Sequence, residues 1–239
     1  MLNFYNELHL GDCIYHIPYC RKLIDANPGL EIKFYIRPQY FNEVQNFIGD
    51  YNITLYPVSE KPLNAVDTWL NRSGKFWPEW VHTFQKLNDL IYVELFNEIS
   101  NVISIENPIK CSYDHLIDDE RLLINNELSG HFDYLIINSG GFSGQWNDVK
   151  CFNTLINKLK LLNKKVVTTA PNTASMPCTL DYNLSIFDIG NISTNCENII
   201  GVHTAPFASA LNVFNIDKLK SVYLCQVQGL NYSFKMSIV

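Results

Sequence analysis

Short apolar runs of strand type alternate with helical stretches, and this alternation constrains the fold more than any other feature of the chain. In the first 60 residues, strands are expected at 2–8, 31–36 and 53–56. A helix follows each of the first two strands and ends near Asn27 and near Ile48, respectively. This order of strands and helices implies a parallel sheet with right-handed crossovers and with helices on both faces.

A second series of the same kind begins at residue 133. Its strands are expected at 133–138, 166–169, 184–189, 198–202 and 221–227. Asn147-Asp148 is expected to cap a helix between the first two of these strands. The polar segment 114–128 separates the two series, so we expect an N-terminal domain at 1–128 and a C-terminal domain at 129–239.

Composition and charge narrow the class of protein. The chain has 239 residues and a formal net charge of −6, which argues against a nucleic-acid binder that relies on phosphate contacts. No apolar run reaches the roughly 18–20 residues of a transmembrane segment, so any membrane contact is expected to be peripheral. The N-terminus does not resemble a signal peptide, and the seven cysteines contain no C-x-x-C pair. These features predict a cytoplasmic protein with reduced thiols and no zinc site.

The segment after 198–202 has the pattern of a phosphate-binding turn. The stretch Gly201-Val-His-Thr-Ala-Pro206 consists of small and turn-prone residues, and helical spacing begins at Phe207. A strand, a tight turn and a helix in this order present backbone N–H groups and the positive end of the helix dipole to an anion. His203 and Thr204 are the side chains best placed to contact a phosphate there. An ordinary strand-to-helix turn of an α/β sheet has the same pattern and is the alternative.

Four segments carry a resemblance to a known family. They are His9–Leu23 with its Gly-Asp, apolar stretch, Pro, Arg and Leu; Asn27–Ile32; Gln145-Trp146 followed by Phe152 and Leu155; and Gly201–Pro206. Together, and in this order, they resemble glycosyltransferase family 9, the heptosyltransferase-like group of the GT-B enzymes. The resemblance implies an α/β, GT-B-like chain of two Rossmann-like domains, with mainly parallel sheets and an interdomain cleft. It also implies that 1–128 is the acceptor-side domain and that 129–239 binds the nucleotide sugar.

The resemblance also assigns a catalytic base. An inverting sugar transferase needs a base for the acceptor hydroxyl, and it needs positive charge or N–H groups for the leaving diphosphate. Asp12 matches the catalytic Asp of the family, and Gly11 lets a ligand approach the backbone closely. His16 follows one helical turn later and could pair with Asp12. The alternatives are that Asp12 is only the N-cap of its helix and that His16 is only packed in the core.

The donor is expected to bind loop residues of the second domain. These are Ser139, Gly140, Gly141 and Ser143 after the first strand, Thr169 and Ala170 after the second, and His203, Thr204 and Ala205 at the phosphate turn. The family holds the nucleoside near Ala170–Thr173, although the acidic residue expected there for the ribose is absent. Gln145 stands where the family has a donor-binding Lys, and His203 could compensate for that loss. A flexible loop without a ligand is the alternative for the glycine-rich segment.

These features predict a metal-independent glycosyltransferase, inverting and of hexosyl or heptosyl type. It would move a sugar from a nucleotide-diphosphate sugar, which is a substrate and not a cofactor, to a glycan or lipid-linked acceptor. No metal is expected, because the chain lacks the Asp-x-Asp motif of metal-dependent GT-A enzymes. The lost Lys at position 145 and a length that is short for the family favour an alternative, a catalytically degenerate GT-B-like protein that acts as a binding or assembly module, whereas the retained Gly11-Asp12 opposes it. A third hypothesis is an α/β enzyme that uses His203 or Cys13 covalently.

Overall fold

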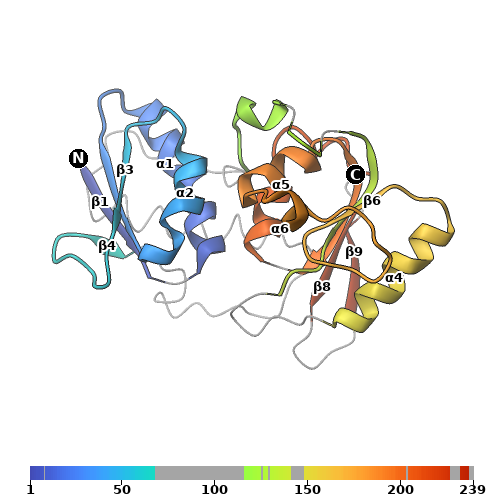
Figure 1. The fold of residues 1–239 in the computed structure, drawn as a ribbon. Helices are drawn as coiled ribbons and strands as arrows, with labels where there is room; N and C mark the ends of the chain where they lie inside the picture. Colours follow the sequence, from blue (N-terminus) through green and yellow to red (C-terminus); the bar gives the residue numbers. More distant parts are fainter. Residues whose placement is uncertain are drawn as a thin grey trace. The chain divides into compact units, whose positions relative to one another are not determined.

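The computed structural model describes residues 1–7, 9–67, 116–124, 126–128, 130–140, 148–202, 204–226 and 232–236 (Figure 1). The chain divides into two units, Met1–Leu116 and Ile117–Val239, and each unit has its own sheet. Residues 117–128 therefore belong to the second unit, whereas the sequence places them in the first domain.

Contacts with one buried side chain explain this division. Asn191 lies in helix α5 (Ile186–Ser193), and its Nδ2 donates to the backbone carbonyls of Leu122 and Ile124. Asn126 Nδ2 in turn donates to Asn191 Oδ1 over 2.7 Å. Leu122 is fully buried in the 3-10 helix η2 (Glu120–Leu123), which packs on α5. The segment is thus bound to the second unit by both hydrogen bonds and apolar packing.

The first unit contains a four-stranded parallel sheet in the order β3-β2-β1-β4. Its elements are β1 (Leu2–Asn6), α1 (Leu10–Ala26), β2 (Ile32–Ile36), the 3-10 helix η1 (Pro38–Tyr40), α2 (Phe41–Ile48), β3 (Ile53–Pro57) and β4 (Val66–Asp67). The predicted parallel order of three strands and two helices is confirmed. In the described part of this unit, α1 and α2 pack against each other on one face of the sheet (Figure 1). The sequence predicted helices on both faces; these two lie on the same side, because two successive right-handed crossovers in one direction place their helices there.

Helix α1 is buried around most of its circumference. All eight residues from Cys13 to Cys20 are buried, and Pro18 lies among them without ending the helix. An amphipathic surface helix would show an exposed stripe in a run of this length, so α1 is an interior helix.

The second unit contains a five-stranded sheet in the order β6-β5-β7-β8-β9. Its strands are β5 (Phe132–Ile137), β6 (Val166–Thr168), β7 (Cys196–Val202), β8 (Ser221–Gln226) and β9 (Tyr232–Met236). Besides η2 and α5, its helices are α4 (Val149–Leu161), the 3-10 helix η3 (Thr179–Tyr182) and α6 (Ala205–Ala210). The first four strands are parallel, and β9 pairs antiparallel with β8 at the edge.

The strand predicted at 184–189 is wrong, because this segment begins helix α5. Ser185 is the N-cap: its Oγ accepts the backbone N–H of Asp188, and the Asp188 carboxylate accepts the backbone N–H of Ser185. This reciprocal capping box satisfies two backbone donors at the start of the helix. The apolar run after Ser185 is therefore helical rather than extended.

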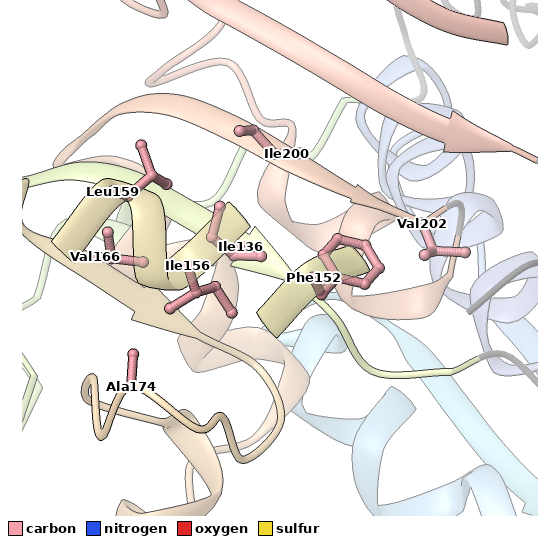
Figure 2. Packing of buried hydrophobic residues seen from close by; sticks show 8 residues of the cluster. All are labelled: Ile136, Phe152, Ile156, Leu159, Val166, Ala174, Ile200 and Val202. Carbon is pink, nitrogen blue, oxygen red and sulfur yellow. The ribbon is translucent and has the colours of Figure 1, made fainter. Parts of the chain in front are cut away.

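The core of the second unit lies between α4 and the sheet (Figure 2). The cluster is formed by Ile136, Phe152, Ile156, Leu159, Val166, Ala174, Ile200 and Val202. The helical residues recur at intervals of three or four, so they line one face of α4. Asp148 caps this helix, since its Oδ1 accepts the backbone N–H groups of Lys150 and Cys151.

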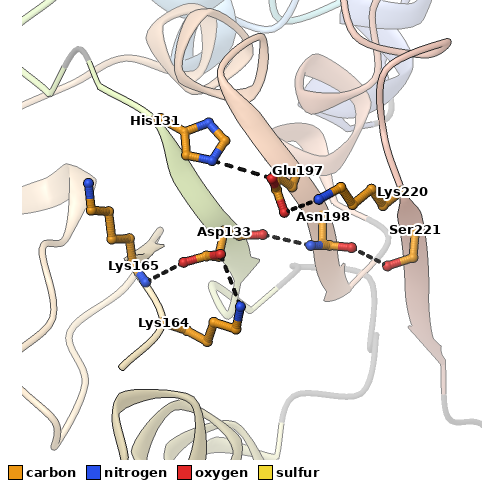
Figure 3. A network of polar contacts seen from close by, with 8 residues as sticks. All are labelled: His131, Asp133, Lys164, Lys165, Glu197, Asn198, Lys220 and Ser221. Carbon is orange, nitrogen blue, oxygen red and sulfur yellow. Dashed lines mark hydrogen bonds and ion pairs between the residues drawn. The ribbon is translucent and has the colours of Figure 1, made fainter. Parts of the chain in front are cut away.

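The amino ends of the central strands are joined by polar contacts (Figure 3). Glu197 at the start of β7 pairs with Lys220 over 2.7 Å and with His131 over 3.5 Å. Asn198 Nδ2 donates to the backbone carbonyl of Asp133 over 2.8 Å, and Asn198 Oδ1 accepts from Ser221 Oγ over 2.6 Å. These contacts hold β5, β7 and β8 together at the edge opposite their carboxyl ends. None of the described helices is both long and apolar enough to span a bilayer.

Candidate active site

The candidate residues gather at the carboxyl edges of the two sheets. In parallel α/β sheets ligands bind outside the carboxyl ends of the strands, where the following loops converge. In the first unit this edge carries the segments after β1 and β2, because Asn6 and Ile36 are register partners at the ends of these strands. In the second unit it carries the segments after β5, β6 and β7.

Asp12 lies in the first turn of α1, not at its N-cap. The helix begins at Leu10, and His9 is the extended N-cap residue, whose side chain makes no capping hydrogen bond. The Asp12 carboxylate accepts hydrogen bonds from the backbone N–H groups of Asp12 itself and of His9. It thus acts like the acidic residue of a capping box, which reaches back to the N-cap. The predicted N-cap role is misplaced by one turn, but Asp12 does help to start the helix.

The environment of Asp12 also suits a general base. Desolvation raises the pKa of its half-buried carboxyl to about 6, against the opposing effect of the two backbone hydrogen bonds. At neutral pH the group is mostly ionised, and it binds a proton more strongly than an ordinary Asp does. A base is most effective when its pKa lies close to the working pH. The preceding Gly11 is also half-buried, next to Asp12 in the first turn.

His16 contacts Asp12 through the backbone and not through the carboxylate. Its Nδ1 lies 2.6 Å from the carbonyl oxygen of Asp12 and 3.5 Å from Nδ2 of Asn6. A carbonyl oxygen can only accept, so Nδ1 carries a hydrogen and donates it. The ring is 1% exposed and lies 6.3 Å from that of Phe34. His16 is therefore a packed residue that fixes the first turn of α1, and it does not pair with the Asp12 carboxylate as the sequence suggested.

Arg37 is a functional candidate that the sequence analysis missed. It follows β2 directly, is exposed, and forms the N-cap of η1. After desolvation, its positive charge is the second cause that lowers the pKa of His9. A charged residue immediately after a second parallel strand was the signal available in the sequence. Arg37 places a cation at the same edge as Asp12.

Cys13 is a poor nucleophile in this environment. It is fully buried, and burial raises the pKa of its thiol well above the usual value, with the Asp12 carboxylate adding to the effect. The reactive form of cysteine is the thiolate, which these conditions disfavour. The structure therefore argues against covalent chemistry at Cys13.

In the second unit, three predicted donor residues come together around a fourth that was not predicted. Asn138 Oδ1 accepts the backbone N–H groups of Thr169 and Ala170 over 3.1 and 2.8 Å, and Asn138 Nδ2 donates to the Ala170 carbonyl over 3.1 Å. The backbone N–H of Ser139 donates to Thr169 Oγ1 over 3.2 Å. Asn138 follows β5 directly, and Thr169 follows β6 directly. Their contact depends on the register of the two strands, which the sequence does not give.

The remaining predicted donor residues are only partly described. Gly140 is exposed after Ser139, and Thr204 and Ala205 are half-buried at the start of α6. Thr204 Oγ1 donates to the Val202 carbonyl over 3.3 Å and does not cap the helix. Because Gly201 is the register partner of Ile137, the segments after β7 and β5 leave the same edge. Gly141, Ser143 and His203 lie outside the described residues.

A surface hollow of about 430 Å³ lies beside this edge, in the segment after β6. Its lining includes Pro171, Asn172, Met176, Cys178, Asp181 and Tyr182. The amide of Asn172 shapes the loop, because Oδ1 accepts the N–H groups of Ala174 and Met176 while Nδ2 donates to Thr168 Oγ1 and to the Met176 carbonyl. These hydrogen bonds thus fix the loop that lines the hollow. The hollow adjoins 170–173, the segment predicted to hold the nucleoside.

The described parts of the chain contain no group of three or more His, Cys, Asp and Glu side chains arranged to hold a metal ion. No protein-family model and no curated protein sequence matches the chain.

Solved structures do match the fold. The heptosyltransferase WaaC of E. coli, determined with ADP-2-deoxy-2-fluoro heptose, aligns with a TM-score of 0.55 and 10% identity over 87% of this chain and 85% of its own. The ADP-heptose lps heptosyltransferase II of E. coli gives a TM-score of 0.52 and 11% identity over 100% of this chain and 94% of its own. The iron-containing, dodecameric glycosyltransferase TibC of enterotoxigenic E. coli aligns with a TM-score of 0.50 and 13% identity over 93% of this chain and 58% of its own.

The predicted α/β fold of GT-B type, with two Rossmann-like units and mainly parallel sheets, is confirmed by this likeness and by the strand pairing. The predicted resemblance to heptosyltransferases is confirmed at the level of the fold.

Proposed function

We propose that the chain is a metal-independent, inverting glycosyltransferase. It would transfer a hexosyl or heptosyl group from a nucleotide-diphosphate sugar to a hydroxyl of a glycan or lipid-linked acceptor. The observation that carries the proposal is the position of Asp12, a carboxyl of raised pKa at the carboxyl end of β1 in a fold shared with heptosyltransferases. The acceptor oxygen attacks the anomeric carbon, its proton passes to Asp12, and the bond from that carbon to the diphosphate breaks.

The donor is proposed to bind at the carboxyl edge of the second sheet. Ser139, Thr169 and Ala170 meet there, and Gly140, Thr204 and Ala205 belong to the segments that leave the same edge. The proposal also keeps Gly141, Ser143 and His203 as contacts on the sequence pattern alone. Hydroxyl donors such as that of Ser139 can stabilise the leaving diphosphate without a cation. This supply of donors, together with a carboxylate base, is the reason for proposing a metal-independent reaction.

The hollow beside this edge is proposed to hold the nucleoside. Tyr182 is 38% exposed at its rim, so its ring can stack on a base, and the Asp181 carboxylate can accept hydrogen bonds from ribose hydroxyls. Asp181 would then replace the acidic residue that the family pattern leads one to expect near Ala170. ADP is the first nucleotide to test, because WaaC was determined with ADP.

The two units are proposed to divide the work, with 1–116 on the acceptor side and 117–239 on the donor side. We place the protein in the cytoplasm, because the five cysteines whose side chains are described are free thiols, as a reducing compartment would leave them. A lipid-linked acceptor would bring the protein to a membrane surface as a peripheral partner. Nucleic acid is not a proposed partner, given the net charge of −6.

Thermal shift against ADP, UDP, GDP, CDP and their sugar conjugates tests the donor. A nucleotide present at 100 times its Kd stabilises the fold by about 2.7 kcal/mol, which is readily measured. Donor turnover with Asp12→Asn then tests the base, with Asp25→Asn as the matched control on the same helix. Asp25 is exposed and accepts a hydrogen bond from the hydroxyl of Tyr51, so its loss should leave turnover unchanged.

A binding or assembly module is the second candidate. It is favoured by Gln145 in place of the expected Lys and by the use of the Asp12 carboxylate to start α1. Nucleotide binding without turnover by the wild-type chain would support the module. A flat response to the whole panel would contradict the transferase.

A further inference from the structure

We infer that Asn138 is a positioning residue of the proposed donor site, whose buried amide fixes the segments after β5 and β6 so that the Ser139 hydroxyl donates to the diphosphate. The inference rests on the proposed function and adds to it a residue that touches no ligand itself. It follows from five hydrogen bonds at the carboxyl edge of the second sheet.

The Asn138 amide continues the β5–β6 pairing beyond the last backbone partners. Those partners are Ile136 and Thr168, and the Thr169 N–H still donates to the Ile136 carbonyl over 3.0 Å. One residue further on, Asn138 both accepts the Ala170 N–H and donates to the Ala170 carbonyl. The side chain thus replaces the backbone as the partner of β6. At 8% exposure, its amide would be costly to bury without these partners.

A hydroxyl relay extends this arrangement to Ser139. Thr169 Oγ1 accepts the Ser139 N–H over 3.2 Å, and it lies 3.1 Å from Ser139 Oγ and 3.4 Å from Asn138 Oδ1. Asn138 Oδ1 already accepts two backbone N–H groups, so the single hydroxyl hydrogen of Thr169 goes to the nearer Ser139 Oγ. The donor and the acceptor of each hydrogen bond between Ser139 and Thr169 are then fixed.

This relay decides which group of Ser139 can serve a ligand. The Ser139 N–H is used by Thr169, and the Ser139 oxygen accepts from the same hydroxyl. The Ser139 hydroxyl hydrogen is then directed away from Thr169, and no described residue accepts it. An oriented O–H donor at the carboxyl edge of a parallel sheet suits an anionic oxygen. Ser139 would therefore contact the diphosphate through its side chain, and Asn138 would set the direction of that hydroxyl through Thr169.

The test compares Asn138→Ala with Asn198→Ala. Both asparagines are 8% exposed and join neighbouring strands of the same sheet, but Asn198 lies at the opposite edge (Figure 3). Calorimetry would measure the affinity for the nucleoside diphosphate that shifts wild type most, and for the corresponding nucleoside without phosphate. We expect both variants to lose similar stability. Only Asn138→Ala should bind the diphosphate about tenfold more weakly, with nucleoside affinity unchanged.

Thr169→Val is the second variant, in case Asn138→Ala does not fold. It removes the hydroxyl relay and leaves the bonds from Asn138 to the backbone in place. The same selective loss of diphosphate affinity is expected. Equal weakening of diphosphate and nucleoside in these variants would reveal general loosening and overturn the inference, as would unchanged diphosphate affinity. If wild type binds no nucleotide, the proposed function fails first, and the inference falls with it.

Discussion

Gly201 of β7 lies directly opposite Ile137 of β5, so close that a Cβ on Gly201 would stand 2.4 Å from the Ile137 Cβ and 2.9 Å from the Ile137 carbonyl oxygen. Real Cβ atoms do not approach other atoms this closely, and both strands lie inside the sheet. Ile137 immediately precedes Asn138, so this close strand contact lies next to the carboxyl edge at which the donor is proposed to bind.

Gly201→Ala should therefore lower the free energy of unfolding by about 1–3 kcal/mol, the usual cost of overpacking a core. Gly130→Ala is the control, because a Cβ there would meet nothing within 4 Å. Urea unfolding of both variants checks the prediction. Equal stability of the two would show that the strands can separate to admit a methyl group.

Asp12→Asn should stabilise the protein at pH 8. Burial raises the Asp12 pKa from 3.8 to about 6, so folding favours the protonated carboxyl. The stability that this gives is complete below pH 3.8 and is lost as the pH rises through about 6, a loss of about 3 kcal/mol by linkage. A neutral amide avoids that loss. Melting temperatures at pH 4 and pH 8 should differ less in the variant than in wild type, and lower stability of the variant at pH 8 would indicate that the carboxylate mainly starts the helix.

Asp12→Asn should lower catalytic activity, although it should raise stability at pH 8. If Asp12 is the base, only its ionised form is active, so kcat/KM should fall as the pH drops through about 6. Asp12→Asn should reduce turnover by about 10²–10⁴-fold, the usual contribution of a general base. A pH–rate profile of wild type and a single-turnover assay of the variant measure both effects. Undiminished turnover in Asp12→Asn would remove Asp12 from the mechanism.

The neutral His16 ring should be the Nδ1–H tautomer. This follows from the 2.6 Å contact between Nδ1 and the carbonyl oxygen of Asp12. Nitrogen-15 chemical shifts of the ring distinguish the two tautomers. Finding the hydrogen on Nε2 would contradict the contact, and with it the role of His16 in fixing the first turn of α1.

The contacts at the amino ends of the strands should weaken in acid. A side-chain hydrogen bond from Lys220 lowers the pKa of Glu197, and the backbone N–H of Lys165 is the main cause that lowers the pKa of Asp133. The stability that these carboxylates give is present above their ordinary pKa values of 4.5 and 3.8 and is lost as the pH falls through their lowered values. Lys220→Gln should therefore destabilise the protein more at pH 7 than at pH 3. Lys165→Gln is the control, because only its backbone contacts Asp133, and equal effects of the two variants at pH 7 would contradict the assignment.

The sequence predicted each half of the fold because apolar strand runs and helical spacing are local patterns. It failed at 184–189, where the apolar run after Ser185 suggested a strand and the capping pair with Asp188 decides for a helix. It also placed the start of α1 at Asp12, although the helix begins at Leu10. In both cases hydrogen bonds at the helix start decided the outcome, and hydrophobic periodicity does not detect them.

The candidate site was predictable only in part for a similar reason. Ser139, Thr169 and Ala170 follow strand ends, so the sequence could single them out, and the structure brings them together. Asn138 and Arg37 act on residues that are distant in sequence, and the register of parallel strands determines those contacts. Periodicity identifies strands without fixing their register.

The anchoring of residues 117–128 by Asn191 bears on how the second half of the chain could exist by itself. A protease that cut after Leu128 would free a piece whose Asn191 amide had lost the carbonyls of Leu122 and Ile124 and the side chain of Asn126. Cleavage before Ile117 would keep all of them. The smallest fragment that keeps these contacts is therefore longer than the part that forms the sheet. It includes the described residues of 117–128, which contribute no strand to that sheet.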